Sequence, residues 1–126
     1  MASIGIRHVH VFVADHDRAV AFYKEAFSME EQFRDGAIVF VGTPDGGDSL
    51  ALHLATTDAE RARIGQQGGY NHFGIHLADR SAEGIGEAVR RVEKAGGRLI
   101  ERGEHAPGIG YAYVADLDGY VIEIGS

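Results

Sequence analysis

The sequence predicts an α+β fold built from two consecutive βαβββ modules. Two observations support this. The segment Tyr70–Asp79 repeats the pattern of Ile6–Asp15 at a constant offset, which aligns His72 with His8. Each copy is then followed by one helical pattern and three strand-like segments, so the chain reads as an internal duplication within a single domain, residues 1–126. The predicted parts are a first module over 4–55, a linker over 56–69 and a second module over 70–126.

The first module is expected to begin with a strand over residues 4–14, because apolar and polar residues alternate there. The alternation gives two faces: Val9, Val11 and Val13 on one, and His8, His10 and Phe12 on the other. Asp17 is expected to cap the following helix, which should cover the valine face. Three strands complete the module, over residues 31–34, 37–42 and 49–55, and in the last one His53 lies opposite a face of leucines.

The second module is expected to repeat this order, starting with a strand over residues 70–79 that carries His72 and His76 on its polar face. The next helix should end at Gly96 and Gly97. Two strands, 98–102 and 111–115, are separated by a glycine-rich loop over 103–110. His105 lies in that loop, which could close over the sheet face, but an ordinary exposed histidine without a role is the expectation.

The last strand contains one carboxylate, Glu123, in an otherwise apolar run. Asp118 and Gly119 form a strong turn signal before it, and Glu123 alternates with buried positions on the strand that follows. An ionised carboxylate in a half-buried strand is costly unless it is paired, hydrogen-bonded or bound to a metal. Glu123 should therefore have compensating groups nearby.

Alignment of the two halves supplies those groups, because it superposes His8 on His72 and His53 on Glu123. The four side chains should project from the open face of one curved sheet whose other face is covered by helices. Imidazole and carboxylate ligands suit Zn, Ni, Co, Fe or Mn ions. The alternative is a hydrogen-bonded polar cluster in a metal-free pocket, and for His53 a position in the pocket wall.

Composition restricts the partners. A net charge of −7 without a Lys/Arg cluster argues against nucleic acid or an anionic membrane surface, which leaves a small molecule as the expected partner. The chain has no cysteine, so disulfides, thiolate metal sites and thiol nucleophiles are excluded. No membrane span or signal peptide is recognisable, and a cytoplasmic location is expected.

Four motifs, in this order, resemble the vicinal oxygen chelate superfamily, which includes glyoxalase I, bleomycin-binding proteins, fosfomycin-resistance transferases, methylmalonyl-CoA epimerase and extradiol dioxygenases. The motifs span the chain: Ile6-Arg-His8-Val, Ala14-Asp15 with Ala21-Phe-Tyr23, Asn71-His72-Phe-Gly, and Asp116-Leu-Asp-Gly-Tyr-Val-Ile-Glu123. The resemblance implies the glyoxalase/bleomycin resistance/dioxygenase fold with a cavity that holds a divalent metal. It also implies a homodimer, in which the ligands come from one chain or from two.

The implied metal ligands are His8, His53, His72 and Glu123. The implied function is that of a lyase or isomerase, in which the metal chelates two neighbouring substrate oxygens and stabilises an enolate or alkoxide. Candidate catalytic residues are Glu123, His10 and His76 for proton transfer and Tyr113 for substrate orientation, although both histidines could be pocket residues instead.

His53 departs from the glyoxalase I pattern, which generally has a carboxylate or amide there. Without His53 the remaining ligands form the two-histidine, one-carboxylate set of non-haem iron oxygenases, so an Fe(II)-dependent dioxygenase is an alternative. A second alternative is a non-enzymatic dimer that binds a drug or metabolite.

Overall fold

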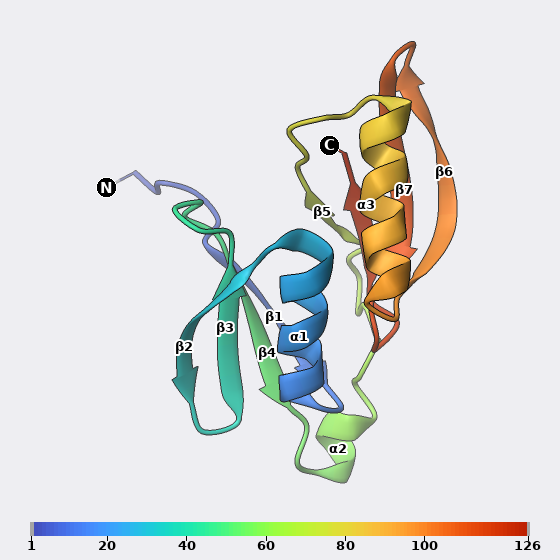
Figure 1. Cartoon of the computed structure of the whole chain (residues 1–126). Coiled ribbons are helices and arrows are strands. Elements are labelled where there is room, and N and C mark those ends of the chain that lie inside the picture. Colours follow the sequence, from blue (N-terminus) through green and yellow to red (C-terminus); the bar gives the residue numbers. More distant parts are fainter. Residues whose placement is uncertain (1, 126) are drawn as a thin grey trace.

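A computed structural model describes residues 2–125 and contains two modules with the predicted βαβββ order (Figure 1). Its elements are β1 (His8–Val13), α1 (His16–Phe27), β2 (Glu30–Asp35), β3 (Ile38–Gly42), β4 (Ser49–Leu54), α2 (Asp58–Arg61), β5 (Phe73–Ile75), α3 (Ala82–Lys94), β6 (Arg98–Ala106), β7 (Ile109–Ala115) and β8 (Val121–Ile124). The predicted α+β fold is confirmed. The short helix α2 lies in the predicted linker.

Hydrogen bonding divides the predicted curved sheet into two sheets of four strands, ordered β1-β4-β3-β2 and β5-β8-β7-β6. The first strand of each module pairs in parallel with the last, and the other pairs are antiparallel. Each module therefore brings its first and last strands side by side. This topology puts the predicted ligand strands, β1 with β4 and β5 with β8, next to one another.

The helices cover one face of each sheet, and α1 lies beside α3 where the modules meet (Figure 1). The valine face of β1 packs into the core, since Val13 is fully buried and Val11 nearly so. In the second module Ile122 and Ile124 of β8 are fully buried. Burial of such a side chain stabilises the fold by about 1.5–3 kcal/mol. The opposite sheet faces carry the histidines and Glu123.

Helix α1 is capped by Asp15 and not by Asp17, as the sequence had suggested. Asp15 has extended backbone angles, and its Oδ1 accepts a hydrogen bond from the backbone N–H of Arg18 at 3.1 Å. Asp17 lies in the first turn, where Arg34 donates to it at 2.9 Å. Sequence could not separate the two, because both residues are good N-caps directly before the apolar stripe.

Three predicted boundaries are also different. Strand β1 starts at His8, and the preceding Ile4 and Ile6 are exposed. Strand β5 is limited to three residues, all paired with β8. The predicted loop over 103–110 is mostly strand, because β6 continues to Ala106 and turns sharply at Gly108, whose φ of +79° suits glycine.

The turn before β8 holds the two modules together. The buried carboxylate of Asp116 accepts hydrogen bonds from the backbone N–H groups of Asp118 at 3.0 Å and Tyr120 at 2.9 Å, and from the hydroxyl of Tyr23 in α1 at 2.5 Å. The Tyr120 hydroxyl donates to the backbone carbonyl of Phe12 at 2.7 Å. The Asp116 motif is therefore a structural device that fixes the start of the strand carrying Glu123.

No helix within residues 2–125 is long and apolar enough to cross a membrane.

Candidate metal centre

Glu123 lies on the open face of the second sheet, as its place in the alternation predicts. Ile122 and Ile124 point into the core, whereas the Glu123 side chain is 12% exposed. Its pKa is lowered, chiefly by a hydrogen bond from His105 and also by one from His72. The carboxylate is therefore ionised at neutral pH and carries the negative charge that a cation requires.

His72 is the first of two imidazoles on this carboxylate. Its Nε2 lies 3.1 Å from Oε1 of Glu123, and its Nδ1 lies 2.6 Å from Oδ1 of Asn71. Its ring also packs edge-on against Tyr113, with centroids 5.0 Å apart. The hydrogen bond to Glu123 requires the hydrogen on Nε2. In the other tautomer Nδ1 carries the hydrogen and donates to Asn71, which leaves Nε2 with the lone pair that a metal ligand needs.

His105 is the second imidazole, and sequence reasoning missed it. Its Nε2 lies 2.8 Å from Oε2 of Glu123, and its ring stacks on Tyr111 with centroids 4.4 Å apart. The residue was assigned to a loop because of the surrounding glycines. Pro107-Gly108 is a turn signal, and reading it as a hairpin turn would have extended the strand through His105.

The histidines of the first module form a separate group. Nε2 of His10 lies 3.0 Å from Nδ1 of His53, while His8 is exposed and meets the edge of the Phe40 ring at 6.0 Å. Burial lowers the pKa of His10, and the neighbouring His53 and His8 add to this effect. His53 is therefore a partner of His10.

The strand register changes the predicted correspondence of His53. In the second module Gly74, two residues after His72, is level with Glu123. In the first module His10, two residues after His8, is level with Ala51, whereas His53 is level with Phe12. The equivalent of Glu123 is thus Ala51, and the alignment with His53 was shifted by two residues. A two-residue shift keeps a side chain on the same face, so alternation alone could not detect it.

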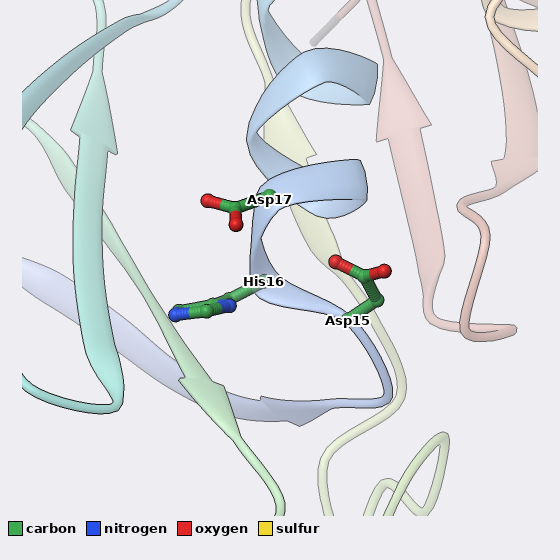
Figure 2. A group of neighbouring side chains, drawn as sticks. All are labelled: Asp15, His16 and Asp17. Atoms are coloured by element: carbon green, nitrogen blue, oxygen red, sulfur yellow. The ribbon is translucent and has the colours of Figure 1, made fainter.

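The four predicted ligands do not converge on one point. Among residues 2–125, the one set of three His, Asp or Glu residues with all ligand atoms within 4.8 Å is Asp15, His16 and Asp17. Figure 2 shows the Asp15 carboxylate directed to the other side of the chain from His16 and Asp17. Since Asp15 caps α1 and Asp17 binds Arg34, this set is explained by the helix start.

A cavity of about 500 Å³ lies between the edges of β1 and β5. Its lining includes His8 from the first module and Gly74 and His76 from the second. Tyr113 lies on β7, level with Glu123 on β8. The predicted catalytic residues thus lie in three places. His10 lies beside His53, Tyr113 lies beside His72 and Glu123, and His76 lines the cavity.

The side-chain chemistry of His8, His72 and Glu123 fits a divalent metal. Imidazole nitrogens with one carboxylate and no thiolate suit Zn, Ni, Co, Fe or Mn ions, and would leave coordination positions open for a substrate.

Comparison with known protein families agrees with the resemblance carried by the sequence motifs. A model of the Glyoxalase/Bleomycin resistance protein/Dioxygenase superfamily matches residues 5–124. None of the curated proteins matches the sequence significantly.

Solved structures share the fold. One is a glyoxalase-related enzyme from Fulvimarina pelagi, with 24% identity, a TM-score of 0.73 and coverage of 97% of this chain and 87% of that one. A second is a mutant of the fosfomycin resistance protein FosX from Listeria monocytogenes, complexed with Mn(II) and a dihydroxypropylphosphonic acid, with 21% identity, a TM-score of 0.72 and coverage of 98% and 90%. A third is lactoylglutathione lyase from Agrobacterium tumefaciens, with 20% identity, a TM-score of 0.66 and coverage of 99% and 95%.

Proposed function

The chain belongs to the glyoxalase/bleomycin resistance protein/dioxygenase superfamily, and we propose that it is a metal-dependent enzyme of the lyase or isomerase type. Its substrate is a small molecule with two neighbouring oxygen atoms. The observation that carries the proposal is the Glu123 carboxylate, which is 12% exposed on an open sheet face and contacts the Nε2 atoms of two histidines. A partly buried carboxylate beside two imidazoles has the ligand chemistry that is typical of a metal centre.

The residues that would hold the ion are His8, His72 and Glu123. His53 is left out because the register gives Ala51 as the equivalent of Glu123. A divalent ion bound by such ligands acts as a Lewis acid toward a substrate oxygen and leaves open positions for chelation.

His10 is the residue we propose as the base. Its lowered pKa keeps it unprotonated at neutral pH, and its hydrogen bond to His53 gives an abstracted proton a second imidazole to move to. Glu123 is a weaker candidate for this step, since its pKa is lowered and its carboxylate is already engaged. Tyr113, level with Glu123, would orient the substrate, and His76 would line its entrance.

A homodimer would complete the site. His8 lies on one sheet and His72 with Glu123 on the other, and in the described part of the chain they do not come within the 4.8 Å that a shared ion needs. Each sheet has a face that no helix covers, and on the first sheet this face carries the exposed Phe33, whose ring lies beside Phe40 and through it beside His8. A second copy that covers these faces would bury them and bring one chain's His8 to the other chain's Glu123.

Metal analysis of protein purified without an affinity tag tests the proposal. Wild type should contain or take up a divalent metal close to stoichiometrically, Glu123→Ala should lose it while staying folded, and His53→Ala should retain it. Full retention by Glu123→Ala would refute the assignment. Mixing His8→Ala and Glu123→Ala proteins, each expected to lack metal, tests the shared site, because a mixed dimer would regain one complete centre and part of the metal.

A second candidate, Fe(II)-dependent dioxygenation, is favoured by the three-residue set of two histidines and one carboxylate. Oxygen uptake by iron-loaded protein with catechol-type substrates distinguishes it from lyase or isomerase chemistry. Tight ligand binding that survives chelation would instead favour the non-enzymatic binding dimer.

A further inference from the structure

Glu123 is held from both sides, and the two contacts are not equivalent. Oε1 contacts His72 at 3.1 Å, and Oε2 contacts His105 at 2.8 Å. A carboxylate can only accept, so Nε2 of His105 carries the hydrogen and donates it. Each oxygen of Glu123 thus has its own imidazole.

His105 reaches Glu123 because of an irregularity in its strand. Glu104 pairs with Gly110 and Ala106 with Ile109, so the register shifts at the residue between them. Such a β-bulge redirects a side chain, and bulges are frequent near active sites. The His105 side chain is thereby turned across β7 onto Glu123 of β8, two strands away.

Stacking on the ring of Tyr111 holds the His105 ring in this position. The ring lies almost parallel to that of Tyr111, at 20° and 4.4 Å between centroids, and the Tyr111 hydroxyl donates to Glu101 at 3.3 Å. Tyr111 can lie there because its neighbour on β6 is Gly103, where an added Cβ would meet the Tyr111 ring and hydroxyl at 3.0–3.2 Å. Tyr111, Glu101 and Gly103 therefore all help to hold His105 against Glu123.

The geometry points to His105 as a positioning residue of the metal centre, which holds Oε2 of Glu123 so that Oε1 and Nε2 of His72 are both left to face the ion. This inference rests on the proposed function. His105 is not itself a ligand of the same ion, since His72, Glu123 and His105 do not form a set within 4.8 Å in the part of the chain that the structure describes. Hydrogen bonds to a ligating carboxylate typically change metal affinity by 10–100-fold.

The test is Co(II) titration of chelator-stripped full-length protein by calorimetry and by visible absorption. His105→Ala should weaken Co(II) binding by about 10–100-fold. His105→Gln should recover most of the loss, because its Nε2–H can donate to the same oxygen. His16→Gln, a histidine change in the first module near Arg34, is the matched control and should bind as wild type does.

The absorption spectrum separates positioning from ligation. In His105→Ala saturated with Co(II), the d–d bands should keep the wild-type intensity, because the coordination number is unchanged. Equal affinities of His105→Ala and wild type would overturn the inference alone. A changed coordination number without rescue by His105→Gln would overturn it in favour of a direct ligand. Wild type that binds no Co(II) would refute the proposed function and this inference together.

Discussion

Ionisation of Asp116 should make the protein less stable as the pH rises from 4 to 7. Its side chain is buried, and burial outweighs the hydrogen bonds it accepts and raises its pKa from 3.8 to about 6. Because the folded state binds this proton more tightly than the unfolded state, the stabilisation is complete below about pH 3.8 and is lost as the pH passes through 6. A separation of about two pH units corresponds to about 3 kcal/mol of unfolding free energy.

Asp116→Asn isolates this contribution. The amide oxygen can still accept from the backbone N–H of Tyr120, and the amide group can donate to Tyr23, but the residue no longer titrates. Urea unfolding at several pH values should give a difference in free energy between wild type and Asp116→Asn that falls by about 3 kcal/mol between pH 4 and 7. Parallel pH profiles of the two proteins would refute the reasoning.

The substitution Tyr23→Phe independently tests the direction in which the pKa of Asp116 shifts. The Tyr23 hydroxyl stabilises the ionised form of Asp116, so its removal should raise the pKa of Asp116 further and shift the loss of stability to higher pH. A shift to lower pH would show that the hydroxyl does not donate to the carboxylate.

Three substitutions test other contacts by urea unfolding. Tyr120→Phe should cost about 1 kcal/mol, because it removes the hydrogen bond to the Phe12 carbonyl that joins the modules; no loss would mean that water replaces it. Gly97→Ala should cost about 1–3 kcal/mol, because its Cβ would lie 2.6–2.9 Å from three heavy atoms, whereas Gly69→Ala meets nothing within 4 Å and should stay within about 0.5 kcal/mol. Asp15→Ala should cost about 1 kcal/mol as a lost N-cap; a neutral effect would contradict the revised cap.

The sequence predicted the module order and the face of each site residue, because both depend on local periodicity. Val13 and Ile122 are fully buried, and His8 and Glu123 lie on the opposite faces, as alternation requires. The length of β5 was not predictable in the same way. It has three residues because it pairs only with the short strand β8, and that limit comes from tertiary pairing.

His105 shows a second limit of local reasoning. The glycines around it suggested a flexible loop, whereas Gly103 makes room for a tyrosine ring and Gly108 closes a hairpin. Neither use can be read from composition, since glycine serves loops, turns and close contacts alike. The bulge that directs His105 to Glu123 depends on the pairing partner and leaves no local signal.

His53 shows that alternation predicts the face of a residue but not which residue it pairs with on the neighbouring strand. Each module has a histidine at its first predicted ligand position, His8 or His72. Two residues further along the same strand are His10 and Gly74, and the residues that pair with them are Ala51 and Glu123. The second module thus carries the charge that a cation needs, and the first carries a neutral site beside a pair of imidazoles, His10 and His53. If the modules arose by duplication, the proposed function implies that they diverged in role: the second would supply two of the metal ligands, His72 and Glu123, and the first would supply His8 and the histidine pair that would move a proton.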